Sequence, residues 1–141
     1  MKSLLLTKEC DYGMRILRAL SDGKIRKVKD IYTGECIPPQ FCYKILKKLE
    51  NGGLVMAKRG RVGGYILAKS TEEITLLDVV RSVTGEPAIV QCIANREACE
   101  MKLTDTCTIH KEFSRIQEIL DRELSKKTFV ELLQGRTVEG G

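Results

Sequence analysis

A glycine-rich, arginine-bearing segment at residues 58–64 lies between two short apolar runs at residues 54–57 and 65–68. Its sequence, Lys-Arg-Gly-Arg-Val-Gly-Gly, combines turn-forming glycines with cationic side chains. Two strand-like runs around such a tip are typical of a β-hairpin. Three helical segments precede it, and the order helix, short helix, helix, hairpin is that of a winged helix-turn-helix.

The three helices before the hairpin are predicted from their end signals. Thr7 is an N-cap for a first helix that continues to about residue 20. A short second helix follows at about residues 28–33, where Gly34 breaks it. The third helix begins at the Pro38–Pro39 pair, because proline suits the first turn of a helix, and ends near residue 51 before a pair of glycines.

Beyond the hairpin, residues 75–78 resemble a capping box that opens a fourth helix. A cysteine-bearing segment of weak periodicity follows, and then a long amphipathic helix at about residues 108–126. We therefore predict a mainly α-helical fold with a small β-hairpin. The expected divisions are a winged helix-turn-helix DNA-binding domain (1–87), a cysteine-rich cluster-binding segment (88–110), a dimerisation helix with a C-terminal helix (108–134) and a flexible tail (135–141).

Positive charge is concentrated in the first half of the chain. Residues 1–71 contain fifteen Lys and Arg against six Asp and Glu, whereas the whole chain of 141 residues has a net charge of +5. A basic half beside a near-neutral half is expected when one end meets nucleic-acid phosphates, although a solvated lysine-rich surface would look the same. No apolar run approaches the roughly 18–20 residues of a membrane helix, and the start does not resemble a signal peptide. We expect a cytoplasmic protein, in which cysteines bind metals, sense redox state or are buried.

The third helix and the hairpin supply the candidate DNA contacts. In a helix-turn-helix, the N-terminal end of the second motif helix enters the major groove. There, Gln40 could read adenine and the rings of Phe41 and Tyr43 could touch thymine methyl groups. The remaining candidates are Lys44 and Lys47 for phosphates, and Arg59, Arg61, Gly63 and Gly64 in the hairpin. The alternatives are solvation of the lysines, core packing of Phe41, or a winged helix that binds protein.

Cys92, Cys99, Cys107 and His110 follow the spacing Cys-x6-Cys-x7-Cys-x2-His. Three thiolates can hold an iron–sulfur cluster and leave one position for a fourth ligand, which His110 or Asp11 could supply. Zinc is the alternative metal, but the wide gaps lack the usual Cys-x2-4-Cys knuckle, and a thiol-bearing loop without metal is also open. The other cysteines, Cys10, Cys36 and Cys42, are expected to be small buried residues.

The long final helix carries an apolar stripe that is too wide to leave in water. We expect it to pack against its copy in a homodimer, which would present two recognition helices to a pseudo-palindromic operator in double-stranded DNA. The stripe is formed by Ile109, Phe113, Ile116, Leu120 and Leu124.

With these features, the chain resembles the Rrf family of bacterial winged-helix regulators. The resemblance covers nearly the whole chain. It rests on the cysteine triplet and on residues 6–7, 37–41, 49–55 and 59–65.

This resemblance implies a DNA-binding dimer with a [2Fe-2S] or [4Fe-4S] cluster held by Cys92, Cys99 and Cys107 in each subunit. His110 matches the fourth-ligand position of the family's iron–sulfur cluster regulators, and Asp11 matches the aspartate of its nitric-oxide-sensitive repressors. The loops here are longer than the family's Cys-x5-Cys-x5-Cys, so the cluster type and the fourth ligand both stay open.

We therefore expect a transcriptional regulator, a repressor, that senses redox, iron or nitric oxide status through an iron–sulfur cluster. The alternatives are a cluster-free regulator that depends on thiols or zinc, and a cluster carrier or electron-transfer protein. A carrier would need neither the basic half nor the hairpin. The single histidine, without a nucleophile–base pattern, indicates that the chain is not an enzyme.

Overall fold

The computed structural model describes residues 5–102 and 105–140, without the side chains of residues 98 and 135–140. Parts of the expected DNA-binding domain (1–4), cysteine segment (103–104) and tail (141) lie outside the described residues. The elements are α1 (Lys8–Ala19), α2 (Val28–Gly34), α3 (Pro39–Asn51), β1 (Val55–Lys58), β2 (Gly64–Leu67), α4 (Leu76–Thr84), α5 (Gln91–Ala94), the 3-10 helix η1 (Arg96–Ala98), α6 (Thr108–Leu124) and α7 (Phe129–Gly140). This mainly helical architecture with one two-stranded antiparallel sheet confirms the predicted fold class.

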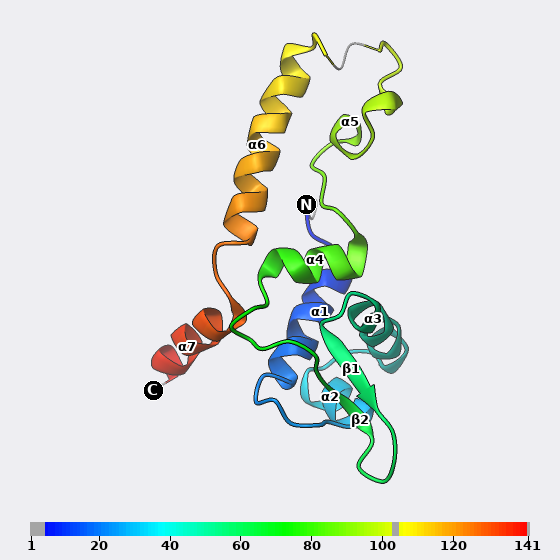
Figure 1. Cartoon of the computed structure of the whole chain (residues 1–141), viewed down its shortest axis with the longest axis vertical. Coiled ribbons are helices and arrows are strands. Elements are labelled where there is room, and N and C mark those ends of the chain that lie inside the picture. The colour runs from blue at the N-terminus through cyan, green and yellow to red at the C-terminus, as the bar shows by residue number, and fades with distance from the viewer. Residues whose placement is uncertain (1–4, 103–104, 141) are drawn as a thin grey trace.

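The molecule consists of a body, formed by α1 to α4 with the hairpin, and an arm, formed by α5, η1 and α6 (Figure 1). The hairpin lies at one end of the long axis, and the loop between η1 and α6 lies at the other end. The cysteines at positions 92, 99 and 107 therefore lie in the arm, whereas the candidate DNA contacts on α3 and the hairpin lie in the body.

Helix α1 begins where the sequence predicted, because Thr7 caps it. The Thr7 hydroxyl accepts a hydrogen bond from the amide of Cys10 at 3.2 Å. One face of α1 is buried against α3 and α4. Gly13 permits the close approach to α4, since a Cβ atom there would lie 3.0 Å from the side chains of Val79 and Val83. The core of the body thus forms between these three helices.

Helix α2 ends one residue later than predicted, because Gly34 is its last residue and does not break it. Cys36, two residues further on, has a φ of +56°. A non-glycine residue with positive φ is uncommon, and the chemistry of cysteine does not predict one at this position. Helix α3 begins with Pro39 in its first turn and ends at Asn51, before Gly52, as predicted.

The hairpin pairs β1 with β2, and Val55 lies opposite Leu67. Each strand is displaced by one residue from its predicted bounds. A further antiparallel bridge joins Arg26 to Tyr65, whose backbone groups exchange hydrogen bonds of 2.9 and 2.8 Å. The segment before α2 thus supports the base of the hairpin.

Helix α4 opens with the predicted capping box. The Asp78 amide donates to the Thr75 hydroxyl at 3.3 Å, and the Thr75 amide donates to the Asp78 carboxylate at 3.0 Å.

The end of α6 returns the chain to the body. Phe129 is 4% exposed, and its amide donates to the carbonyl of Ile74 at 2.9 Å. Helix α7 begins at this residue and continues to Gly140, and so includes residues 135–140 of the segment that was expected to be a flexible tail. The arm is therefore anchored at the start of α7.

No helix within the described part of the chain combines the length and the apolar character that crossing a membrane requires.

Candidate functional site

Helix α3 presents an exposed face at its N-terminal end, as a recognition helix would. Gln40 is exposed, Tyr43 is 58% exposed and Phe41 is 36% exposed. Phe41 also packs on Tyr12 of α1, with ring centroids 6.0 Å apart. The structure thus combines the two interpretations of Phe41, because the ring both contacts a neighbouring helix and reaches the surface. Whether these side chains contact bases stays a prediction.

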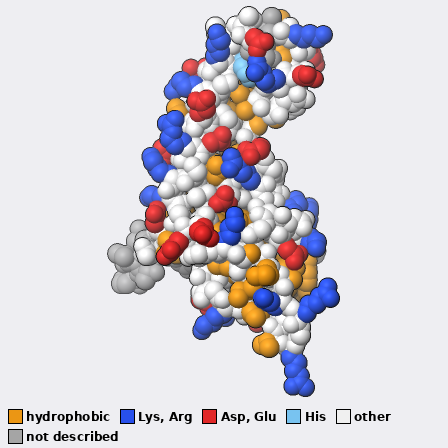
Figure 2. Space-filling view, viewed as in Figure 1, with side chains coloured by type: hydrophobic (Ala, Val, Ile, Leu, Met, Phe, Trp, Pro, Cys, Tyr) orange, Lys and Arg blue, Asp and Glu red, His pale blue; other side chains and the backbone are white. Residues whose placement is uncertain are grey.

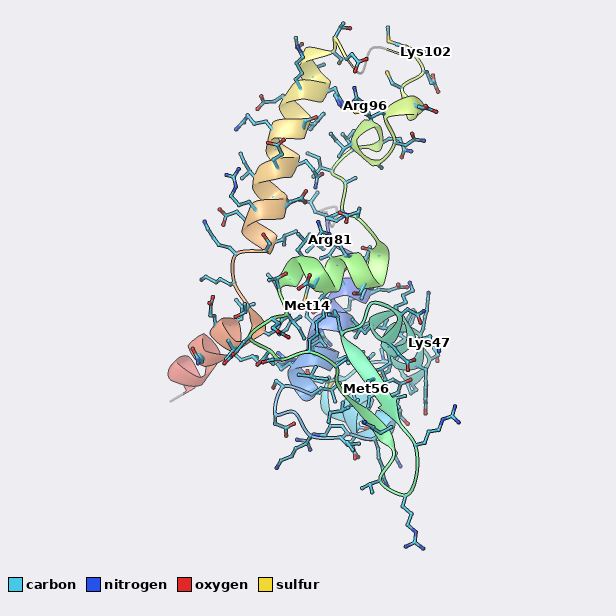
Figure 3. All side chains as sticks on the ribbon, in the orientation of Figure 1. Met14, Lys47, Met56, Arg81, Arg96 and Lys102 are labelled. Atoms are coloured by element: carbon cyan, nitrogen blue, oxygen red, sulfur yellow. The ribbon has the colours of Figure 1, made fainter. Side chains whose placement is uncertain are left out.

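The lysines of α3 are already paired with carboxylates. Lys44 Nζ and Lys48 Nζ each lie 3.0 Å from an oxygen of Glu9, which belongs to α1. Lys47, on the outer side of α3 (Figure 3), lies 3.4 Å from Glu50 of the same helix. Hydrogen bonds from Lys44 and Lys48 lower the pKa of Glu9, which keeps its carboxylate charged. Sequence reasoning missed Glu9, because nothing in the sequence places it beside α3.

Arg59 and Arg61 are exposed at the tip of the hairpin, where Figure 2 shows Lys and Arg side chains at the lower end of the molecule. The two glycines beside them have an internal role. A Cβ atom on Gly63 would lie 2.9 Å from the carbonyl oxygens of Lys58 and Gly60, and one on Gly64 would lie 2.1 Å from that of Arg26. These glycines shape the hairpin itself, whatever the hairpin binds.

Cys92 and His110 are brought together across the arm. The Sγ atom of Cys92 in α5 lies 3.1 Å from Nδ1 of His110 in the first turn of α6. The Ser114 hydroxyl donates to the His110 carbonyl at 2.9 Å and lies 3.4 Å from His110 Nε2. Both side chains are half-buried. Two of the five candidate donors are therefore adjacent, with the imidazole oriented by a neighbouring hydroxyl.

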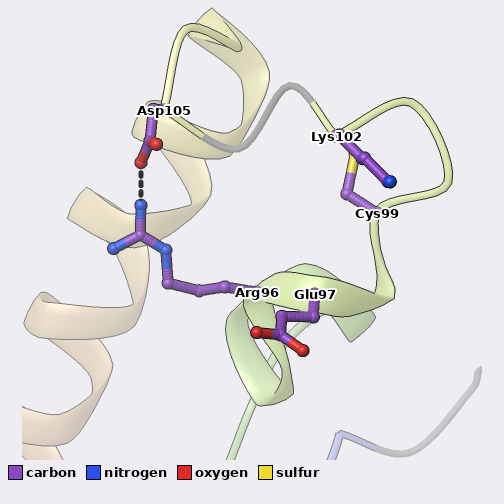
Figure 4. Close-up of a pocket in the computed structure, with 5 residues that line it drawn as sticks. All are labelled: Arg96, Glu97, Cys99, Lys102 and Asp105. Atoms are coloured by element: carbon purple, nitrogen blue, oxygen red, sulfur yellow. Dashed lines mark hydrogen bonds and ion pairs between the residues drawn. The ribbon is translucent and has the colours of Figure 1, made fainter.

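The other two thiols lie on the connection between α5 and α6. Cys107 is the residue before α6 and is half-buried. Cys99 lies after η1 and lines an open depression of about 750 Å³ that is bordered by an ion pair between Arg96 and Asp105 (Figure 4). Over residues 5–102 and 105–140, no three His, Cys, Asp or Glu side chains are close enough together to hold a metal ion.

Asp11 is engaged elsewhere. Its carboxylate lies 2.9 Å from Arg15 and 3.3 Å from Lys8, both on α1 in the body. Asp11 lies on α1 in the body, whereas Cys92 belongs to α5 of the arm (Figure 1), and within the described residues Asp11 joins no group of three potential metal ligands.

The remaining cysteines differ in burial. Cys10 and Cys42 are buried, as predicted, and burial raises the pKa of the Cys42 thiol to about 11. The prediction that Cys36 is buried was wrong. Its thiol is exposed because the residue forms the turn after α2 instead of packing against the core.

Gln117 links α6 to the segment that leads from the body into the arm. It is 6% exposed, and its Oε1 accepts from the Ile89 amide at 2.9 Å. Its Nε2 donates to the Pro87 carbonyl and to Asp121, each at 2.9 Å. A single side chain thus satisfies two backbone groups of the connection. The sequence could not indicate this, because a glutamine in an amphipathic helix usually faces solvent.

The apolar stripe of α6 is only partly covered. Ile109 is 67% exposed and Ile116 is 38% exposed, whereas Phe113, Leu120 and Leu124 are half-buried. Ile119, whose side chain is 40% exposed, extends the uncovered part of this face.

Comparison with known proteins gives one consistent result. The sequence model of the Rrf2 family, described as an iron-dependent transcriptional regulator, matches residues 6–135. The protein aau3 of Rhizobium meliloti (strain 1021) is 31% identical over 136 residues, which cover 95% of this chain and 82% of that protein.

Two solved structures have the same fold. The global cysteine regulator CymR of B. subtilis has a TM-score of 0.72 at 24% identity, over 94% of this chain and 96% of that chain. IscR of T. potens has a TM-score of 0.72 at 19% identity, over 95% of this chain and 89% of that chain.

Proposed function

Because the chain belongs to the Rrf2 family of transcriptional regulators, we propose that it represses transcription as a homodimer and senses redox, iron or nitric oxide status through an iron–sulfur cluster. Family membership confirms the resemblance found in the sequence, and the family is one of transcriptional regulators rather than enzymes. The cluster, the dimer, the cytoplasmic location and the individual site residues are the proposed parts.

The observation that carries the cluster proposal is the contact between Cys92 and His110. These residues are eighteen positions apart, yet their donor atoms lie 3.1 Å from each other. Cys99 and Cys107 lie on the connection between the helices that hold this pair. Three half-buried thiols and an imidazole fit an iron–sulfur cluster in donor type.

The residues have separate proposed roles. Cys92, Cys99 and Cys107 would hold the cluster as thiolates, and His110 would be the fourth donor from the same chain. Asp11, which lies in the body, would serve only if a second subunit supplied it. A bound cluster would add iron that responds to electrons, oxygen or nitric oxide.

For DNA, Gln40, Phe41 and Tyr43 are proposed to contact bases in the major groove. Lys47, Arg59 and Arg61 are proposed to contact phosphates or the adjacent minor groove. The exposed isoleucines of α6 support the dimer, because a stripe of this kind needs a partner.

A cluster-free thiol-dependent or zinc-dependent regulator is the second candidate. It is favoured by the placement of Cys99 and Cys107, since the described residues contain no group of three potential ligands within metal-binding distance. In that case, oxidation of the thiols or a zinc ion would be the signal.

The test is anaerobic purification followed by iron and sulfide counts and absorption and Mössbauer spectra. We expect iron and sulfide in the wild type, and their loss in Cys99→Ala. The matched control is Cys36→Ser, which removes an exposed thiol outside the segment and should retain both. Wild-type protein that stays free of iron after anaerobic reconstitution would reject the cluster in favour of the second candidate.

A further inference from the structure

Glu9 and two lysines of α3 form an ion-pair cluster between the first helix and the recognition helix. Each carboxylate oxygen of Glu9 lies 3.0 Å from one ammonium group, Oε1 from Lys44 and Oε2 from Lys48. The two lysines are one helical turn apart and lie on the same face of α3. One carboxylate therefore bridges two cations.

This cluster depends on the tertiary structure. Glu9 precedes Lys44 by 35 residues and Lys48 by 39, and its side chain is only 25% exposed. The ion pair between Lys47 and Glu50, in contrast, joins two residues of one helix. Its lysine side chain is more exposed than those of Lys44 and Lys48. The packing of α1 on α3 thus holds a negative group beside two of the lysines of the recognition helix.

A DNA phosphate would meet the same two lysines. Lysine binds phosphates as a point charge, and such contacts supply the sequence-independent part of DNA affinity. To contact Lys44 or Lys48, a phosphate would either displace the Glu9 carboxylate or lie beside it. Displacement breaks two ion pairs, and proximity brings two negative charges together. Both reduce the gain from binding.

We propose that Glu9 competes with backbone phosphates for Lys44 and Lys48 and thereby limits the sequence-independent affinity of α3 for DNA. This inference rests on the proposed DNA-binding role of α3. Gln40 and Tyr43, the candidate base contacts, lie outside the ion-pair cluster, so Glu9 acts on the phosphate contribution.

The test is Glu9→Gln, measured by fluorescence anisotropy with a labelled DNA duplex of mixed sequence over a range of NaCl concentrations. We expect binding at low salt to tighten by about three- to tenfold, and the slope of log affinity against log salt to steepen by about one to two. The matched control is Glu112→Gln, which removes the same charge from an exposed pair with Arg115 on α6. This control should change affinity much less.

A second set of variants separates competition from a purely structural role. In a Lys44→Gln/Lys48→Gln background, Glu9→Gln should have no further effect on DNA affinity. If Glu9 serves only to hold α1 on α3, Glu9→Gln would lower thermal stability without tightening DNA binding, and the proposal would be overturned. Should Glu9→Gln fail to fold, Glu9→Asp keeps the charge but shortens the reach, and it should tighten binding by a smaller factor.

The failure of this inference can be told apart from the failure of the proposed function. Wild-type protein that binds the duplex, together with an unchanged Glu9→Gln variant, overturns the inference alone. Wild-type protein that binds no duplex, including those enriched by selection from a random pool, overturns both.

Discussion

Gly64 occupies a backbone position that excludes a side chain for two reasons. Its φ is +152°, and a Cβ atom would lie 2.1 Å from the carbonyl oxygen of Arg26. That carbonyl accepts the hydrogen bond from the Tyr65 amide at 2.8 Å, which holds the base of the hairpin. We predict that Gly64→Ala lowers the free energy of unfolding by about 3 kcal/mol, measured by urea denaturation.

The control for this prediction is Gly34→Ala. Gly34 lies in α2 without a positive φ, and nothing lies within 4 Å of where its Cβ would be placed. Alanine has the higher helix propensity, so this change at the last residue of α2 should raise stability by about 0.5 kcal/mol, less than the value of about 1 kcal/mol for a helix interior. Equal effects of the two substitutions would show that the clash with Arg26 does not matter.

Single residues also mark the limit of what the sequence could predict about the site. The chemistry of the donors could be recognised, because thiols, an imidazole and basic side chains are visible as residue types. The contacts of Glu9 with Lys44 and Lys48, and of Gln117 with Ile89, could not, since they join residues 28 to 39 positions apart. Only tertiary packing decides which of many carboxylates or amides meets a given partner.

Among the elements, the helices with clear end signals were the best predicted. Thr7, Pro39 and the Thr75 capping box act through local hydrogen bonds or fixed dihedrals, so the sequence alone indicates them. The end of α2 was predicted one residue too early, because Gly34 remains helical and has no positive φ. The strands were displaced by one residue because their pairing, supported by the bridge from Arg26, sets their bounds.

The connection between α4 and α6 depends on Gln117. Replacing Gln117 by leucine leaves the Ile89 amide and the Pro87 carbonyl without their side-chain hydrogen-bond partner. An unsatisfied buried backbone group costs about 1–3 kcal/mol, and the half-buried Pro87 and Ile89 should fall at the lower end of this range. We predict that Gln117→Leu destabilises the arm by this amount, seen as faster hydrogen exchange at the Ile89 amide.

Gln91→Leu is the chemically matched control, because Gln91 is an exposed glutamine in α5. It should leave exchange at Ile89 unchanged. Unaltered protection of this amide in Gln117→Leu would mean that the side-chain hydrogen bond does not hold the connection.

In the whole molecule, the arm separates the cysteine segment from the DNA-contact candidates. The hairpin tip and the loop after η1 lie at opposite ends of the long axis (Figure 1). Among the described residues, the arm meets the body where α6 packs on α4, through the hydrogen bonds of Gln117, and at the buried Phe129 just after α6. A signal at the cysteines can change DNA affinity only if it stabilises one of two arrangements of the arm relative to the body, and if the two arrangements differ in their affinity for DNA.

Because the hairpin and the cysteine segment are far apart, we predict that a substitution can weaken DNA binding without affecting the proposed cluster. Arg59→Ala/Arg61→Ala should weaken binding to duplex DNA by about tenfold or more at low salt and reduce the salt slope by about two, because two cations leave the hairpin. The iron and sulfide content of this double variant should equal that of the wild type, since the hairpin is remote from Cys92 and His110. Arg115→Ala/Arg122→Ala removes two exposed cations from α6 instead, and should retain most of the DNA affinity. Loss of iron from the hairpin variant, or undiminished DNA binding by it, would contradict this assignment of the two ends.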